Sequence, residues 1–207
     1  MQEATLTCPH CHQAGKHELQ PFLDLGKHPK QKLAILTDSL FTVSCPSCAK
    51  QFTVLHELLV VDEKQHIGLL LAPQSEAREL DGSAIGKEGL QSYTLRLVAT
   101  TAGLKEKILL LDSNLDDRTI ELCKLYLTMY LEKPDAQLYF AEHQTQADKL
   151  LFSVLDGNGA LEGSIECEDE LYEQLLTTAQ QVPLKAGFFT AVDQRWAYEY
   201  IRNSADR

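Results

Sequence analysis

The 207-residue sequence has no apolar run of about 18 residues, the length at which a helix could cross a membrane. It also lacks an excess of positive charge, because 19 lysines and arginines stand against 30 aspartates and glutamates, a formal net charge of −11. A protein that binds nucleic-acid phosphates needs a basic face. We therefore expect neither a membrane protein nor a nucleic-acid-binding protein, and we take the acidic excess to be a solvated surface.

Signatures of common active sites are missing as well. There is no nucleophile elbow or phosphate loop, and the glycines at positions 82, 86 and 89 lack both the G-x-G-x-x-G spacing and a preceding apolar strand. The first five residues show neither the basic end nor the apolar core of a signal peptide. These absences predict a cytoplasmic protein that keeps its thiols reduced, and they do not favour an enzyme.

Against this background, two short cysteine pairs stand out: Cys8-Pro9-His10-Cys11 and Cys45-Pro46-Ser47-Cys48. The spacing within each pair lets a tight turn direct both sulfurs to one point. Two such turns facing each other form a closed cage of four thiolates, which suits zinc and leaves no open coordination position. The sequence therefore predicts one structural Zn²⁺ bound by Cys8, Cys11, Cys45 and Cys48.

Other interpretations of these cysteines remain open. Cys8 to Cys11 match a strongly oxidising thioredoxin-like motif, which needs a strand before it and a helix after it, but residues 12–16 show no apolar helical stripe. Cys8 to His12 match a haem-attachment pattern that requires export, and disulfides require an oxidising compartment. Mixed cysteine and histidine ligation is a further possibility, because five of the seven histidines lie in the first 60 residues: His10, His12, His17, His28 and His56. Such a site would leave one of the four thiols without a metal to bind.

The 33 residues between the cysteine pairs should hold structure of their own. Residues 29–36 predict a short helix with Pro29 at its first position and Leu33 with Leu36 or Ile35 on its buried side. Residues 40–44 predict a strand that leads to Cys45, and residues 51–55 one that leads away. The second cysteine pair should then lie at the tip of a hairpin.

The remaining elements follow from hydrophobic periodicity and turn residues. A polar stretch, residues 73–92, predicts a mobile loop without a dedicated function. We expect strands at 59–62, 67–71, 93–99, 138–141, 150–155, 160–167 and 188–192, and helices near 104–111, 117–132, 169–181 and 193–203. The helix at 117–132 is apolar around most of its circumference and should be central and buried, with Cys123 as a small hydrophobic residue.

Asp116 to Glu121 resemble a catalytic carboxylate pair at first sight, but helix capping explains them better. Acidic residues before an apolar helix complement its positive end and accept hydrogen bonds from free backbone N–H groups. Asp117 and Glu121 are one turn apart, which is typical of an exposed helical face. We expect a cap or an ion pair with Arg118, and no catalytic residue.

The cysteine pairs, the helical insert, the 59–71 hairpin and the Asp116-Asp117-Arg118 segment, in this order, resemble the bacterial CpXC family over about residues 5–132. The resemblance implies one metal site on a small α+β domain and no assigned activity. Family members often carry glycine after each second cysteine, where this chain has His12 and Ala49. Glycine eases a left-handed turn, so some strain is expected at both positions.

Taken together, the sequence predicts an α+β protein in which a zinc-ribbon-like pair of cysteine turns sits on a mixed or antiparallel sheet with packed helices. A first domain is expected at 1–132, and a smaller α+β segment at 135–207 should pack on it. The expected role is a protein-binding or adaptor module in the bacterial cytoplasm, with an unidentified protein partner. The alternatives are a metal-dependent or thiol-redox enzyme and a nucleic-acid-associated ribbon. A nucleic-acid-associated ribbon would need five lysines to lie on one face: Lys16, Lys27, Lys30, Lys32 and Lys50.

Overall fold

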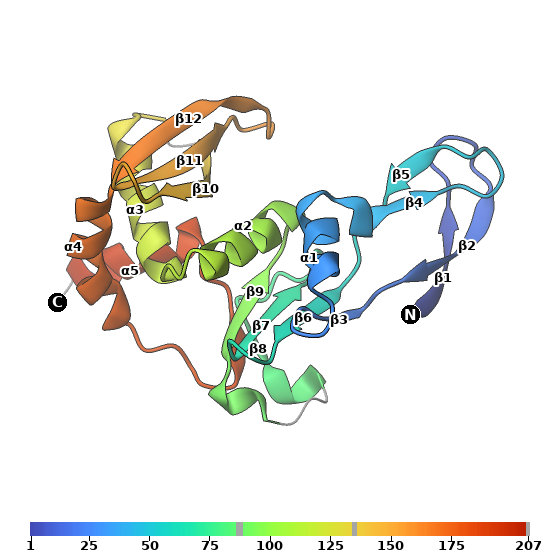
Figure 1. Ribbon diagram of the computed structural model, residues 1–207, viewed down its shortest axis with the longest axis horizontal. Coiled ribbons are helices and arrows are strands. Elements are labelled where there is room, and N and C mark those ends of the chain that lie inside the picture. Colours follow the sequence, from blue (N-terminus) through green and yellow to red (C-terminus); the bar gives the residue numbers. More distant parts are fainter. Residues whose placement is uncertain (86–88, 134–135, 206–207) are drawn as a thin grey trace. The chain divides into compact units, whose positions relative to one another are not determined.

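A computed structural model describes residues 1–85, 89–133 and 136–205, and this part of the chain contains five α-helices and thirteen β-strands. The fold is α+β, as predicted (Figure 1). The chain forms two compact units: residues 1–104 with 186–190, and residues 105–185 with 191–207. None of the described helices is long and apolar enough to span a membrane.

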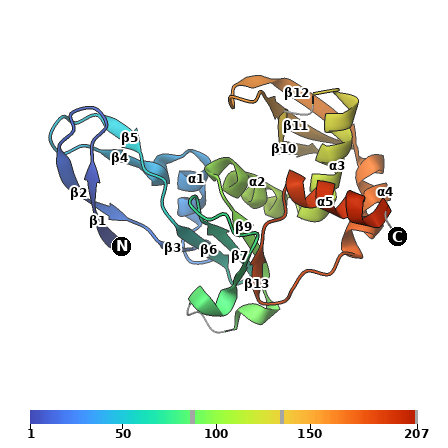
Figure 2. The same cartoon turned by 180° about the vertical axis from the view of Figure 1, so that it is seen from behind.

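The first unit is built around a mixed six-stranded sheet (Figures 1 and 2). Its strands, in spatial order, are β3 (Phe22–Asp24), β6 (Leu58–Asp62), β7 (Ile67–Leu71), β9 (Thr94–Val98), β13 (Phe188–Thr190) and β8 (Glu79–Asp81). Pairing is antiparallel between β6 and β7 and between β8 and β13, and parallel elsewhere. The predicted 59–71 hairpin is confirmed, and Leu58 to Val61 are buried on both faces of the sheet, which explains their uninterrupted apolar run.

Two short ribbons carry the cysteine pairs. In one ribbon β1 (Gln2–Thr7) pairs with β2 (Ala14–Leu19), and in the other β4 (Thr42–Ser44) pairs with β5 (Gln51–Thr53), both antiparallel. Each cysteine pair lies in the turn that joins its two strands, so the prediction that the second pair lies at a hairpin tip is confirmed.

Between the ribbons, helix α1 (Pro29–Leu36) begins with Pro29, as predicted. Ile35 is its buried residue, whereas Leu33 is 65% exposed, so the expectation that Leu33 lies on the buried side is wrong. A one-turn 3₁₀ helix at Ser39–Phe41 follows and buries Phe41. Residues two positions apart on an α-helix point to nearly opposite sides, so the burial of Ile35 places Leu33 toward solvent.

The polar stretch at 73–92 is more ordered than its composition indicated. It contains β8, which pairs with β13 at the edge of the sheet, and two 3₁₀ turns at Gly82–Ile85 and Leu90–Ser92. The long loop expected there therefore contains regular elements, while its mobility stays a prediction and positions 86–88 lie outside the described residues. A three-residue strand with one intermediate residue is too short to leave a periodic signal.

The second unit packs helices on a three-stranded antiparallel sheet of order β10-β11-β12. The elements are α2 (Thr101–Asp112, from Lys105 onward), α3 (Asp117–Tyr130), β10 (Gln137–Gln144), β11 (Lys149–Leu155), β12 (Leu161–Glu168), α4 (Asp169–Gln180) and α5 (Gln194–Ala205). Ile120, Cys123 and Leu127 of α3 lie in one core with Phe140 and Phe152 of the sheet. The helix shares this core with the residues that follow it, but Tyr126, Met129 and Tyr130 are exposed, so the expectation of a helix buried around most of its circumference is wrong.

The compact units do not follow the predicted domain limits. The division falls after Leu104 rather than after Glu132, and β13 returns to the first unit from far along the sequence. Positions 134 and 135, at the predicted boundary, lie outside the described residues. That residues 135–207 pack on residues 1–132, and that neither part folds alone, stays a prediction.

Candidate metal centre

The two cysteine turns repeat one backbone plan. The N–H groups of Cys8 and Cys45 donate to the carbonyl five residues further along, at 3.0 and 2.9 Å. Their carbonyl oxygens accept from His12 and Ala49, at 3.0 and 2.9 Å. Both turns therefore close in the same way, which fixes the direction of each sulfur pair from backbone contacts alone.

A second pair of contacts points backbone donors at sulfur. The N–H of His10 lies 3.4 Å from Cys8 Sγ, and the N–H of Ser47 lies 3.4 Å from Cys45 Sγ. Donors at this distance stabilise negative charge on sulfur, as thiolate ligands require. The backbone of the two turns therefore stabilises thiolates at Cys8 and Cys45 independently of a bound ion.

The structure brings Cys8, Cys11, Cys45 and Cys48 together, with all four sulfurs within 4.8 Å of one another. Across the two turns, the Sγ atoms of Cys8 and Cys48 are 3.8 Å apart, and those of Cys11 and Cys45 are 3.6 Å apart. Zinc with Zn–S bonds of about 2.3 Å holds its sulfurs about 3.8 Å apart. The donor set and its spacing therefore fit a tetrahedral metal ion, and the four-cysteine cluster could bind one.

These distances also separate the cluster from a disulfide pair. Disulfide sulfurs are bonded at about 2.05 Å, and all four cysteines here are free. A strand, β1, does precede Cys8, as a thioredoxin-like site requires, but the strand β2 follows where that site needs a helix. The geometry thus favours a metal site over the thioredoxin-like and disulfide interpretations.

The thiols of the cluster influence one another's protonation. The backbone N–H of Cys48, aided by that of Ser47, lowers the pKa of Cys45 to about 6. At Cys11, the backbone of Gln13 lowers the pKa, but burial and the neighbouring thiols outweigh it and raise the pKa to about 12. The first proton is therefore lost easily and a later one only with difficulty, because negative charge accumulates. A divalent cation removes that penalty.

A lowered cysteine pKa is a feature of redox sites as well as of metal sites. Solvent access to the sulfur therefore decides between a redox role and a metal-binding role. Cys45 is 3% exposed and Cys8 is 1% exposed, which leaves little surface for a thiol or disulfide substrate. Reactive cysteines are ordinarily partly exposed. Burial therefore favours a structural role for Cys8 and Cys45.

The nearby histidines make other contacts. His10 Nε2 lies 3.2 Å from the carbonyl of Gln51, and His56 Nε2 lies 3.1 Å from that of Gln20. The His17 ring packs edge-on against Phe52. These contacts use the histidines to hold strands and ribbons, in agreement with the expectation that cysteine alone forms the site.

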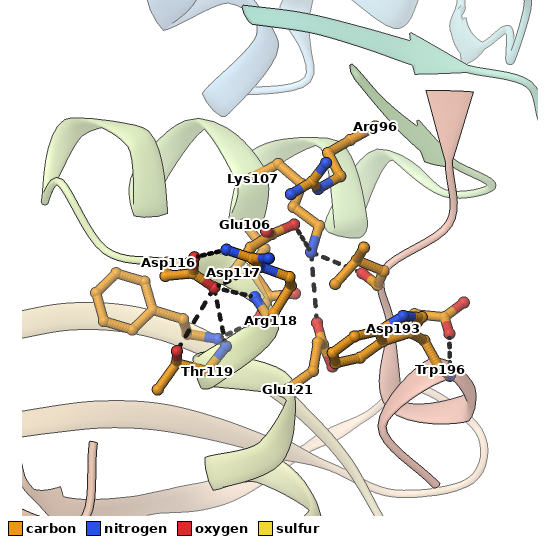
Figure 3. A network of polar contacts seen from close by, with 12 residues as sticks. Arg96, Glu106, Lys107, Asp116, Asp117, Arg118, Thr119, Glu121, Asp193 and Trp196 are labelled. Carbon is orange, nitrogen blue, oxygen red and sulfur yellow. Dashed lines mark hydrogen bonds and ion pairs between the residues drawn. The ribbon is translucent and has the colours of Figure 1, made fainter. Parts of the chain in front are cut away.

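Asp116 caps α3, as predicted. Its carboxylate accepts from the N–H groups of Arg118 and Thr119 and forms an ion pair with Arg118 at 2.6 Å (Figure 3). Arg118 also donates to the Val182 carbonyl, at 3.2 Å. The contacts of this carboxylate are thus those of a helix cap and an ion pair.

Asp117 and Glu121, expected on an exposed face, are instead turned inward. Glu121 is 1% exposed, and both carboxylates approach Lys107 Nζ, at 2.9 Å from Asp117 and 3.6 Å from Glu121 (Figure 3). Lys107 also donates to the carbonyl of Val192, at 2.7 Å. The prediction is wrong because it considered the charges of α3 alone, whereas the lysine that draws them inward comes from α2.

The network continues to a second buried lysine. Lys124 Nζ lies 2.9 Å from Glu121 and 3.0 Å from both oxygens of Glu106, which in turn accepts from the N–H of Phe140 at 2.6 Å. Burial raises the pKa of Glu121 to about 7, despite the two lysines. Burial alone would lower the pKa of Lys124, but the carboxylates of Glu106 and Glu121 raise it. The network joins α2, α3 and β10 in one ionic cluster.

The remaining cysteines, Cys123 and Cys167, are both buried in the core of the second unit. The prediction for Cys123 is confirmed, and Cys167 lies in β12 as expected. Its proximity to Cys123 was not foreseen: the hydrogen bond that the Cys123 thiol donates to Cys167, together with burial, raises the pKa of Cys123. Protonated thiols in an apolar core are packing residues.

A family model described as CpXC protein matches residues 6–124, more than half of the chain. No curated protein and no solved structure matches the chain.

Proposed function

Because the chain belongs to the CpXC family, we propose that it is a protein-binding module of the bacterial cytoplasm whose four-cysteine cluster holds one structural zinc ion. The observation that carries the zinc assignment is the cage itself: four sulfurs from two equivalent turns, within 4.8 Å. Four protein thiolates fill a tetrahedral coordination shell and leave no position for a substrate. The metal would join the two ribbons covalently.

The stabilising role follows from the small size of the two ribbons. Each ribbon has only two strands, and a two-stranded ribbon is marginally stable in water. Structural zinc sites in small domains contribute on the order of 10 kcal/mol to folding. Zinc would thus replace the hydrophobic core that the ribbons are too small to form.

Metal analysis with single cysteine variants tests this assignment. Purified protein should contain about one equivalent of zinc per chain. Replacing Cys8, Cys11, Cys45 or Cys48 by serine should release the metal and unfold residues 1–60. The matched control is Cys123→Ser, a buried cysteine outside the cluster, which should keep the metal. Metal-free protein with unchanged thermal stability would refute the zinc assignment.

A thiol-redox enzyme is the second candidate, and the lowered pKa of Cys45 is the observation in its favour. It predicts rapid alkylation of Cys45 at neutral pH in the protein as purified, together with turnover of a disulfide substrate. The zinc module predicts slow alkylation until a chelator is added. Comparing the two alkylation rates by mass spectrometry separates the candidates.

The nucleic-acid alternative has less support. Of the lysines that would need to converge, Lys16 pairs with Glu3 at 2.7 Å and Lys27 pairs with Asp24 at 2.8 Å. They also come from different elements, β2 and the turn after β3. Acidic neighbours reduce the positive potential that phosphate binding needs, so a protein partner is the better proposal.

A further inference from the structure

Helices α3 and α5 of the second unit enclose a hollow of about 620 Å³ on the protein surface. It is lined mainly by apolar atoms, from Leu125, Thr128, Met129, Glu132, Gln194, Arg195 and Tyr198. We call this hollow the α3/α5 groove. The two helices that form it are held against each other. Ala197 of α5 is buried against Leu122 of α3, and Gln194 donates to Thr128 Oγ1 at 3.3 Å.

The groove walls follow helical spacing. On α3, Leu125, Thr128 and Met129 succeed one another at intervals of three and one residues, which places them along one face, and Glu132 follows just beyond the end of the helix. Two helices packed side by side leave a furrow between them whose shape suits a third helix. The groove therefore has the form used in helix-in-groove recognition.

The exposure of the walls shows what size of ligand is suitable. Met129 is 73% exposed and Tyr198 is 59% exposed. A small-molecule site buries most of its ligand between walls that are themselves buried, and these walls are not. Half of the ten large, exposed hydrophobic residues in the described chain lie on these two helices: Tyr126, Met129, Tyr130, Tyr198 and Ile201. Of these five, Met129 and Tyr198 line the groove itself, and exposed apolar side chains gathered at one hollow mark a surface for a macromolecule.

Charge indicates the chemistry of that partner. The second unit contains 10 lysines and arginines and 19 aspartates and glutamates, so it carries −9 of the −11 net charge of the chain. Glu132 contributes one carboxylate at the groove, and the cation in its lining, Arg195, is paired with Glu199 at 2.8 Å. A partner with lysines and arginines beside its apolar face would be attracted to this unit and oriented on it.

We propose that the α3/α5 groove receives a lysine- and arginine-rich amphipathic α-helix of a partner protein. The proposal rests on the proposed protein-binding function and names the surface and the class of partner. The apolar face of the helix would cover Leu125, Met129 and Tyr198, while its cations would lie toward Glu132.

The sequence provides a convenient probe, because its only methionines are Met1 and Met129. In the zinc-loaded full chain labelled with ¹³C-methyl methionine, Met129 reports on the groove and Met1 serves as an internal control. The ligand is a synthetic 18-residue peptide with leucines at i, i+3, i+4 and i+7 and lysines on its other face. A second peptide replaces every lysine by glutamate.

We expect the lysine peptide to shift the Met129 methyl signal and leave the Met1 signal in place, and added salt should weaken this binding. The glutamate peptide should bind at least about tenfold more weakly. Met129→Glu should lower the affinity for the lysine peptide by about tenfold or more, as for an anchor residue. Leu161→Glu, in β12, replaces a residue of similar exposure (70%) and should change it less than about twofold.

Equal binding of both peptides, or equal effects of Met129→Glu and Leu161→Glu, would overturn the proposal. The proposal would also be overturned if the Met129 signal shifted with protein concentration alone and sedimentation showed a doubled mass. The groove would then hold a second copy of the chain. A wrong assignment of the groove can be distinguished from a wrong proposal of a protein-binding function. A cellular partner crosslinked equally by wild type and by zinc-loaded Met129→Glu would keep the binding module and exclude the groove.

Discussion

His12 and Ala49 occupy the same position in the two cysteine turns, each directly after the second cysteine, with φ angles of 59° and 58°. Both lie in the left-handed region, which L-residues other than glycine enter at a cost of about 1–2 kcal/mol. The strain expected from the absence of glycine is therefore present at both sites. Its symmetry shows that the turn geometry, and not either side chain, demands this conformation.

Ala49→Gly should stabilise the protein, because glycine relieves the left-handed strain at a smaller cost in chain entropy. We expect a gain of up to about 1 kcal/mol in the free energy of unfolding. His12→Gly should gain less, since histidine tolerates this region better than alanine. Denaturant titration of zinc-loaded protein measures both.

Ala4→Gly is the matched control for these variants. Ala4 lies within β1, where glycine has no strain to relieve and should cost about 0.5–1 kcal/mol. If Ala49→Gly destabilises the protein as much as Ala4→Gly does, the strain account is wrong.

Asp116→Ala should destabilise the second unit by about 1–3 kcal/mol, because it removes the cap of α3 and the ion pair with Arg118 together. Asp116→Asn keeps an oxygen that can accept from the backbone N–H groups and should recover part of the loss. Thermal unfolding of both variants provides the comparison. Equal losses would show that the ion pair, rather than the cap, supplies the stability.

Glu121 should make the protein less stable as pH rises from about 4.5 to about 7. Burial raises the pKa of this carboxyl on folding, so the folded state holds the proton more tightly than the unfolded state. This loss of stability is absent below the pKa that Glu121 has in the unfolded state and complete above the pKa that it has in the folded state. It should amount to a few kcal/mol.

Glu121→Gln removes the titrating group and should remove this part of the pH dependence. The difference in unfolding free energy between Glu121→Gln and wild type should therefore shift in favour of the variant between pH 4 and pH 8. Chemical denaturation at both pH values measures it. Parallel pH profiles for the two proteins would show that Glu121 keeps an ordinary pKa.

A fragment that ends at Glu132 should be insoluble or molten, even with zinc bound. It retains Ile120, Cys123 and Leu127 of α3 but loses the core residues of β10–β12 that cover them, and it loses β13 from the first unit. Dye binding and loss of near-ultraviolet circular dichroism would show the molten state. Cooperative unfolding of this fragment, and of residues 135–207 alone, would instead establish two independent modules.

The protein should show no useful affinity for DNA or RNA at physiological salt. The chain carries a net charge of −11, and two lysines of the ribbon region are paired with carboxylates. Fluorescence anisotropy with a labelled duplex tests this prediction. Tight binding that weakens steeply as salt is added would contradict it and would revive the nucleic-acid alternative.

Local signals in the sequence were strong enough to predict most helices and strands. Pro29 marked the start of α1, Asp116 marked the cap of α3, and a short apolar run marked β11. The four cysteines of the candidate site were also recognisable, because their spacing is itself the geometric requirement. These features depend on neighbours in sequence, which a single chain displays directly.

Features that depend on distant partners were not predictable. Glu121 and Lys124 are spaced like an exposed helical ion pair, and only the presence of Glu106 and Lys107 on α2 shows that they are buried. The edge strand β8 has three residues and is defined by its pairing with β13, more than a hundred positions later. Periodicity carries no information about such pairings.

The return of β13 to the first unit has a consequence for how this protein is made. Its Phe189 is fully buried in a sheet whose other strands end at residue 98, so 89 intervening residues must be translated before that sheet is complete. Until then a nascent chain leaving the ribosome carries β9 with one unpaired edge, and such edges invite pairing with other chains. At about 5–20 residues per second this interval lasts several seconds. The part of the molecule that is synthesised first is therefore among the last to finish folding.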